Sequence, residues 1–446
     1  MDSNRQMVSA RIGAIVLYAT FALLMFGPLA FGAVEPWSIF VLEAGSVVLT
    51  LLWLAKQWID EEITIQRNPL FLPVSAFGVL ILAQIVFKTS AYSHDTISHA
   101  MQYCAYGMLC FLATQTLTRS TQGRQIGVAM ALYGFALAGF ALLQGLTANG
   151  KLYWVRQPHL GGWIYGPYVN HNHYAGIMEL LVPIPLVISF SHLTHEKERI
   201  AAGVAAAIMV STIFLSGSRG GMLSIFVELA VLTAILFRRK RNVRLGIAAA
   251  SFLLLLVGIV TWLGGKELTT RLSTISSEAH GEISGGTRIS IDRDTLRMFA
   301  QKPILGWGLG CFPVVYPQFR SFYTNFFINE AHNDYLQLLA EMGLAGFAIM
   351  LWFLIAMYRR ALSKIGNWNS EVTGALTLAC ILGVTGILVH SLFDFNLQIP
   401  ANAAFFYVYC GLAAAPPLLQ RARKRRPVVN ETDQAPATEV VQGETA

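Results

Sequence analysis

Charge is the scarcest property of this 446-residue chain. Asp, Glu, Lys and Arg make up only 13% of it. The hydrophobic residues Ala, Val, Ile, Leu, Met, Phe, Trp, Tyr and Cys together make up 54%. A soluble domain carries about 25% charged residues, so this chain is too poor in charge to cover a water-facing surface of its size. The composition excludes a soluble enzyme and a disordered protein, and it indicates an integral membrane protein.

Cysteine is also scarce, with five residues in the whole chain. Four of them fall within apolar runs, and only Cys311 lies in a segment predicted to be outside the cytoplasm. A single outer thiol cannot form an internal disulfide, which excludes a disulfide-stapled secreted module. The cysteines and histidines also lack the spacing of a zinc site. We therefore expect no metal and no cofactor.

The sequence contains many long apolar runs. A helix needs about 20 apolar residues to cross the hydrocarbon core of a bilayer. The first run is longer than the core of a usual signal peptide, so we interpret it as a retained anchor. The sequence predicts an all-α polytopic membrane protein with about 12 transmembrane helices, at Ile12–Phe31, Trp37–Ala55, Leu70–Phe87, Ala100–Leu117, Ile126–Leu146, Tyr174–Leu193, Ile200–Leu215, Met222–Phe237, Leu245–Leu263, Tyr335–Tyr358, Val372–His390 and Ile399–Ala415.

The positions of Lys and Arg predict the orientation of these helices. Both residue types concentrate in the connections that are cytoplasmic if the N-terminus is cytoplasmic, including the runs 238–241 and 421–426. Cytoplasmic loops of membrane proteins carry such an excess, so we expect both termini in the cytoplasm. The net charge of +7 then indicates contact with anionic membrane lipids, and no nucleic-acid partner is needed to explain it.

The predicted topology divides the chain into three regions. These are an N-terminal transmembrane region, 1–160, a second region, 161–415, and a tail, 416–446, that is basic and then disordered. Within the second region, the segment 264–331 precedes the tenth span. A connection much longer than about 15 residues is usually functional or disordered, and this one contains aromatic residues, so we expect a folded outer subdomain. A helix is predicted at about 289–300, ended by Pro303.

Polar side chains suited to chemistry gather at the outer ends of the predicted spans. They form five short clusters on one face, whereas chance would scatter them over both. Ionisable residues inside spans are costly and usually functional, and we expect Glu43 and Glu179 to pair with arginines of these clusters. The candidate site residues are Asn170, His171, His173, Ser218, Arg219, Arg288, Arg293, Arg297, His332, Asn333, Asp334, Tyr335 and Asp394.

The arginines have two interpretations each. Arg219 lies in Ser-Arg-Gly-Gly at the membrane edge, where exposed backbone N–H groups and a bidentate guanidinium suit a phosphate. The alternative is a tight connection with a snorkelling arginine. Arg293 and Arg297 either bind an anion with Arg288 or form a solvated helix face, neutralised by acidic residues at 292 and 294.

The histidines are equally open to two interpretations. His332 precedes a predicted span, and a neutral imidazole there suits a general base at neutral pH. The simpler alternative places it beside a helix start that Asn333 or Asp334 caps. His171 and His173 would point to opposite sides of a strand, which makes them a poor metal pair, and loop histidines commonly serve only as hydrogen-bonding groups. Asp394 has the alternative of capping the break between the last two spans.

Several arginines and one candidate base at the edge of a membrane favour a particular reaction. Arginines can neutralise a leaving diphosphate without a metal, and a histidine can deprotonate the hydroxyl that attacks the carbon bearing it. The chemistry predicted is glycosyl transfer from a lipid-diphosphate sugar. The alternative is a multi-span transporter of a small anion or a lipid-linked sugar. Transporters usually bind their substrate near the membrane midplane, whereas most polar groups here lie at the outer edge.

Three motifs resemble those of the O-antigen ligase and O-antigen polymerase superfamily. The first is His332-Asn333 followed after nine residues by Gly343-Leu344-Ala345-Gly346, and the second is Ser218-Arg219-Gly220-Gly221. The third is the run of glycines after Pro303 that ends at Phe312. Their order and the large loop before the histidine span also agree, and the similarity covers roughly residues 160–400.

The resemblance implies a metal-independent, inverting glycosyltransferase in the bacterial inner membrane, active at its periplasmic face. The implied donor is a glycan on undecaprenyl diphosphate, and the implied acceptor is either a second lipid-linked glycan or lipid A-core, so polymerase and ligase both stay open. Polysaccharide-assembly proteins are the further partners implied. By position, His332 is the base, and Arg219 and Arg288 hold the diphosphate.

Overall fold

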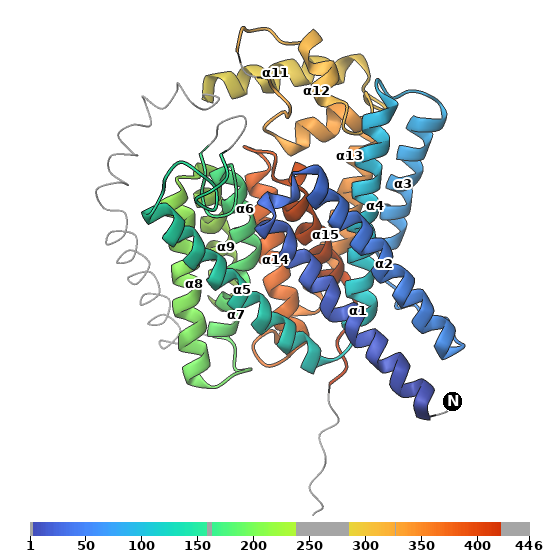
Figure 1. The fold of residues 1–446 in the computed structure, drawn as a ribbon, viewed down its shortest axis with the longest axis vertical. Helices are drawn as coiled ribbons and strands as arrows, with labels where there is room; N and C mark the ends of the chain where they lie inside the picture. Colours follow the sequence, from blue (N-terminus) through green and yellow to red (C-terminus); the bar gives the residue numbers. More distant parts are fainter. Residues whose placement is uncertain (1–2, 158–162, 238–284, 326, 421–446) are drawn as a thin grey trace, which may run out of the picture.

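The structure, a computed structural model, describes residues 3–157, 163–237, 285–325 and 327–420, and it confirms an all-helical protein (Figure 1). Among these residues, eight helical spans are long and apolar enough to cross a membrane, which makes this a multi-pass membrane protein. They are α1 (Ser3–Leu29), α2 (Pro36–Asp60), α5 (Ser120–Leu146), α6 and α7 together (His171–Leu181 and Pro183–Phe190), α8 (Glu196–Ser216), α9 (Arg219–Phe237), α13 (Asp334–Leu362) and α14 (Val372–His390).

Three further helices coincide with predicted spans but are shorter or more polar. These are α3 (Phe71–Val86), α4 (Ser93–Thr116) and α15 (Pro400–Ala414). The predicted span Leu245–Leu263 and the tail beyond residue 420 lie outside the described residues. The predicted outer subdomain is described from residue 285 onward, where α11 (Gly285–Gln301) and the short α12 (Phe312–Val315) lie.

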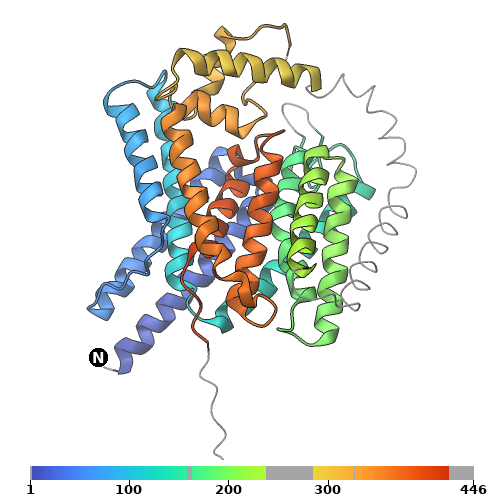
Figure 2. The same cartoon turned by 180° about the vertical axis from the view of Figure 1, so that it is seen from behind.

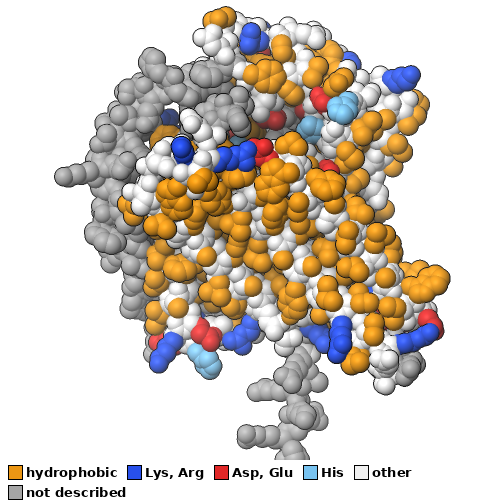
Figure 3. Space-filling model, viewed as in Figure 1, with side chains coloured by type: hydrophobic (Ala, Val, Ile, Leu, Met, Phe, Trp, Pro, Cys, Tyr) orange, Lys and Arg blue, Asp and Glu red, His pale blue; other side chains and the backbone are white. Residues whose placement is uncertain are grey.

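The surface of the bundle has the pattern expected of a protein in a bilayer. A broad belt of hydrophobic side chains covers the middle, while charged side chains gather toward its two ends (Figure 3). Large apolar residues such as Phe40 and Leu132 are more than 60% exposed. Such an extensive apolar surface would aggregate in water, so lipid tails are its natural solvent.

The centre of the bundle is built from the C-terminal helices. α14 packs against α6, α7, α9 and α15, and α15 packs in turn against α4 and α13. α11 and α12 cover one end of the bundle, and α1 begins at the opposite end (Figures 1 and 2). The loop from α14 to α15 lies beneath the α11 cap, which brings the C-terminal part of the chain to the same place as the predicted outer subdomain.

The first turn of α6 differs from the prediction. The span was expected to begin at Tyr174, with His171 and His173 in an extended segment, but α6 begins at His171. The reason is local, since the side chain of Asn170 accepts a hydrogen bond of 2.8 Å from the backbone N–H of Asn172 and so caps the helix. Both histidines therefore lie on a helix.

A break in α13 joins the cap to the bundle. Gly343 has φ 63° and ψ −168°, a conformation that essentially only glycine adopts. The break frees backbone groups, and the outer segment 303–308 binds them. Trp307 N–H donates to Ala340 O at 3.0 Å, and Leu344 N–H donates to Pro303 O at 2.8 Å.

The neighbouring glycine-rich turn is held by a buried carboxylate. Glu341, just before the break, accepts hydrogen bonds from the backbone N–H groups of Gly310 at 2.8 Å and Phe312 at 3.0 Å. Gly310 has φ +73°, and a Cβ there would lie 2.1 Å from the ring of His99. The third sequence motif, the glycine run between Pro303 and Phe312, thus packs against both α4 and α13 and holds them together.

Replacing Gly343 with alanine is expected to destabilise the protein. The backbone conformation alone costs about 1–3 kcal/mol for a residue with a side chain, and the new Cβ would lie 2.3 Å from Ile304 O. Thermal unfolding in detergent should show a clearly lower Tm. Gly78→Ala in α3 is the matched control, because no atom lies within 4 Å of its Cβ position. Equal Tm values for the two variants would show that the break imposes no constraint.

Candidate active site

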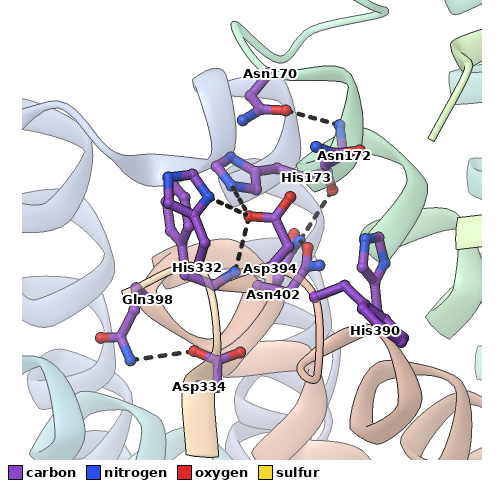
Figure 4. A network of polar contacts seen from close by, with 12 residues as sticks. Asn170, Asn172, His173, His332, Asp334, His390, Asp394, Gln398 and Asn402 are labelled. Carbon is purple, nitrogen blue, oxygen red and sulfur yellow. Dashed lines mark hydrogen bonds and ion pairs between the residues drawn. The ribbon is translucent and has the colours of Figure 1, made fainter. Parts of the chain in front are cut away.

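Asp394 is the centre of a buried cluster in the loop between α14 and α15. Its Oδ1 lies 3.5 Å from Nδ1 of His332, just before α13, and 4.0 Å from Nε2 of His173 on α6. Figure 4 shows both imidazole rings directed at this one carboxylate. The structure therefore brings together three predicted site residues that are far apart in the sequence.

The loop conformation holds the carboxylate in place. Asp394 Oδ1 accepts a 2.9 Å hydrogen bond from the backbone N–H of Phe395. The ring of Phe395 then contacts both imidazoles edge-on, with centroids 4.6 Å from His173 and 4.7 Å from His332. Asp394 is 1% exposed while the His332 side chain is 12% exposed, so the histidine is the member of the pair that a substrate can reach.

Charge keeps Asp394 ionised despite its burial. Burial by itself raises the pKa of this carboxyl, but contact with His332 and the charges of His173 and Arg288 outweigh it and hold the pKa well below its usual value. An ionised carboxylate at Nδ1 of His332 stabilises a positive charge on that ring. Asp394 is not the N-cap of α15, which begins at Pro400, but its side chain does accept a backbone N–H within the break between the last two spans, as the alternative interpretation expected.

Arg288 is the arginine of α11 that reaches this loop. Its Nη1 donates a 2.9 Å hydrogen bond to the carbonyl oxygen of Phe393. One turn further along α11, burial raises the pKa of Asp292, and the charges of His332 and Arg288 oppose that rise. The first turn of α11 is thus bound to the loop that carries Asp394.

Arg293 and Arg297 lie on the other face of α11 and are exposed. Arg297 pairs with Asp294 at 3.2 Å, which confirms the neutralisation that the acidic residue at 294 suggested. The structure does not bring these two arginines into the Asp394 cluster, although both were predicted to bind the diphosphate.

His332 has an unusual backbone conformation, with φ +55°. Few residues with a side chain adopt it, and such strain is concentrated at functional sites. The next residue, Asn333, caps α13 by accepting hydrogen bonds from the N–H groups of Tyr335 at 3.1 Å and Leu336 at 3.2 Å. The predicted helix cap therefore exists, and it holds the histidine at the rim of the cluster.

Asp334 and Tyr335 attach α13 to the neighbouring loop and helix. The Asp334 carboxylate accepts hydrogen bonds from the Ser391 hydroxyl at 2.8 Å and the Leu397 N–H at 3.1 Å. The Tyr335 hydroxyl donates to Leu388 O of α14 at 2.6 Å. Both residues therefore fix the start of α13 against the α14–α15 region.

A buried asparagine that the sequence analysis did not select fastens α6 to α15. Asn402 donates to the carbonyl oxygen of His173 at 2.9 Å and accepts from the hydroxyl of Tyr168 at 2.9 Å. An asparagine within a predicted span is the signal that could have identified it. The ring of His171 instead packs against Trp163 in a tilted arrangement, with ring centroids 4.5 Å apart.

Arg219 lies in a tight turn between α8 and α9. Gly217, with φ +78°, ends α8, and the Ser218 hydroxyl accepts a 3.1 Å hydrogen bond from Gly221 N–H at the start of α9. The tight connection is therefore real, and it leaves the Arg219 side chain exposed. The next residue, Gly220, packs against the ring of His390.

His390 forms a buried pair that sequence reasoning missed. Its Nδ1 lies 2.7 Å from Oε1 of Glu179, and the two side chains are 1% and 0% exposed. The expectation that Glu179 pairs with an arginine was therefore wrong. The acceptor of the Asp394 backbone N–H is the His390 carbonyl oxygen, at 3.1 Å, so one short turn links the Arg219 side of the site to the His332 side.

These features define a multi-pass membrane protein with a histidine–carboxylate cluster at one end of its helical bundle and with Arg288 bound to the loop that carries the carboxylate. Within the described residues, no group of three or more His, Cys, Asp or Glu side chains is arranged to hold a metal ion. Residues 204–351 match a family model described as O-antigen ligase, which confirms the resemblance to the O-antigen ligase and polymerase superfamily. The matched segment contains Arg219, Arg288 and His332. No curated protein matches the chain.

Proposed function

We propose that the protein transfers a glycan from undecaprenyl diphosphate to an acceptor hydroxyl at the periplasmic face of the inner membrane. The family match supports a glycan-assembly function of the ligase or polymerase type. The observation that carries the proposal is the pair of His332 with the ionised Asp394, 3.5 Å apart, beneath an arginine-bearing helix. The end of the bundle covered by α11 is then periplasmic, and α1 begins at the cytoplasmic end.

His332 acts as the general base in this reaction. With Nδ1–H directed at Asp394, Nε2 is free to take the proton of the acceptor hydroxyl. The acceptor oxygen then forms a bond to the anomeric carbon as the bond from that carbon to the diphosphate oxygen breaks. Attack from the side opposite the leaving group inverts the configuration. The carboxylate stabilises the resulting imidazolium, as in other histidine–carboxylate pairs.

Arg219 and Arg288 take the charge of the leaving group. The electron pair of the broken bond stays on the diphosphate, and guanidinium groups neutralise it by paired hydrogen bonds. Arg219 is exposed at the start of α9, where the helix dipole also favours an anion. Arg288 is tied to the loop carrying Asp394.

Glycan profiling of a deletion strain, complemented with wild type or His332→Ala, tests this function. Accumulation of single lipid-linked repeats without long chains indicates a polymerase. Long lipid-linked chains that never reach their lipid acceptor indicate a ligase. An unchanged profile in the mutant strain would contradict both and favour the transporter alternative.

Arg219→Lys is expected to raise the KM for the donor by about tenfold to a hundredfold, since a lysine keeps the charge but loses the bidentate geometry. Arg293→Ala is the matched control, because that arginine is exposed on the outer face of α11. We expect Arg288→Ala to be more damaging than Arg293→Ala. Steady-state kinetics in detergent gives all three values. Wild-type donor KM in Arg219→Lys would place diphosphate recognition elsewhere.

A further inference from the structure

The His390–Glu179 pair has no role in the mechanism described so far. It is fully buried between α6 and α14, with Nδ1 and Oε1 2.7 Å apart. A carboxylate removed from water and left without a cation is strongly unfavourable. Among the described residues, the His390 ring is the cationic group in contact with Glu179. The pair is therefore best balanced as carboxylate and imidazolium.

The other side of the imidazole lies against the turn that carries Arg219. A Cβ atom built on Gly220 would lie 2.5 Å from Cδ2 and 2.6 Å from Nε2 of His390. Only a residue without a side chain allows this approach. The His390 ring is thus enclosed between a carboxylate on one side and the first turn of α9 on the other.

The turn at the start of α9 is also held by a local cap and by packing on α6. Ser218 caps the helix locally, and the side chain of Arg219 is exposed. Gly221 packs closely on α6, since its Cβ would lie 2.7 Å from that of Ala175. The pair from α6 and α14 therefore packs against the α9 turn, and its imidazole, rather than its carboxylate, is the member that contacts the turn.

We propose that His390 and Glu179 are positioning residues for diphosphate binding: the charged pair sets the place of the Arg219 turn and places an imidazolium behind it. The inference rests on the proposed function, because it concerns recognition of the same donor. The backbone N–H of Asp394, on the His332 side of the site, donates to the carbonyl oxygen of His390 at 3.1 Å. The pair is consequently the connection between the base and the anion-binding turn.

Glu179→Gln is the decisive substitution, since it keeps the size of the side chain and removes the charge that maintains the imidazolium. Undecaprenyl diphosphate in nanodiscs serves as the probe, and its Kd is measured by thermophoresis alongside kcat and donor KM. We expect Kd and donor KM to rise about tenfold, because binding loses one close electrostatic interaction. We expect kcat to stay within about twofold of wild type. Glu43→Gln is the control, because Glu43 is a carboxylate on α2, which packs against α1 and α4. Its Kd should equal that of wild type.

Gly220→Ala provides an independent test of the contact. Alone it should weaken probe binding, because the new methyl group displaces the imidazole. Combined with His390→Ala, its additional effect should disappear, since the ring that it displaces is gone. Additive effects in this double-mutant cycle would refute the contact.

The outcomes separate this inference from the proposed function. If wild type binds the probe and Glu179→Gln binds it equally well, the positioning role is wrong and the function stands. If Tm falls together with kcat while Kd is unchanged, the pair has a purely structural role, which also overturns the inference. If wild type does not bind the lipid diphosphate, the proposed function itself fails.

Discussion

His332→Ala should abolish glycan transfer while leaving the protein folded and able to bind donor. General-base catalysis contributes about 10²- to 10⁴-fold to a rate, and no other described imidazole can replace this one. His173 points at the same carboxylate but is 9% exposed, and its Nε2 is the atom that faces Asp394. We therefore expect kcat to fall by at least a hundredfold, measured with purified enzyme and a lipid-linked donor.

The control for this prediction is His94→Ala. His94 is an exposed histidine in the first turn of α4, on the same capped end of the bundle but outside the cluster. It should retain wild-type kcat. Loss of activity in both variants would show that the effect is not specific to His332. Full activity in His332→Ala would show that His332 is not the base.

Asp394→Asn is expected to have the second largest effect. The new amide oxygen can still accept the hydrogen bond from Phe395 N–H, so the loop should keep its shape. What is lost is the negative charge 3.5 Å from Nδ1 of His332, which stabilises the imidazolium and fixes the ring. In serine proteases the same change costs about 10⁴-fold in kcat, and we expect about 10²- to 10⁴-fold here.

The distinguishing measurement is kcat together with donor Kd and Tm. Asp394 is 1% exposed and hydrogen-bonds within its own loop, so we expect Kd to stay near its wild-type value. A large drop in Tm would show that Asp394 is needed mainly to hold the loop together. Unchanged kcat would show that His332 works without a carboxylate partner.

The helices were predictable because composition and run length determine them. Nearly every apolar run within the described residues is a helix in the structure. The helix predicted at about 289–300, before Pro303, corresponds to α11. The break at Gly343 was not predictable, since an isolated glycine in a span normally fits an ordinary helix. Its role depends on the approach of Ile304 and Gly306, about 40 residues earlier in the sequence, which no local pattern encodes.

The candidate site was predictable residue by residue but not as an arrangement. His332, Asp394 and His173 were selected for their chemistry, and yet nothing in the sequence says that they meet. The His390–Glu179 pair joins residues 211 positions apart, each of which was visible as a polar residue near a predicted span. For Arg293 and Arg297, the same chemistry that suggested anion binding could not reveal which face of α11 turns outward.

The α13 break has a consequence for biogenesis. Segment 303–308 supplies the partners of the backbone groups freed at 340–345, and it leaves the ribosome before they do. An unsatisfied backbone group in a bilayer costs several kcal/mol, so a lone α13 would enter the membrane as a defective span. If the end of the bundle covered by α11 is periplasmic, as proposed above, segment 303–308 crosses the membrane before α13 inserts. It is then in place to bind the backbone groups of α13 as that helix enters the membrane.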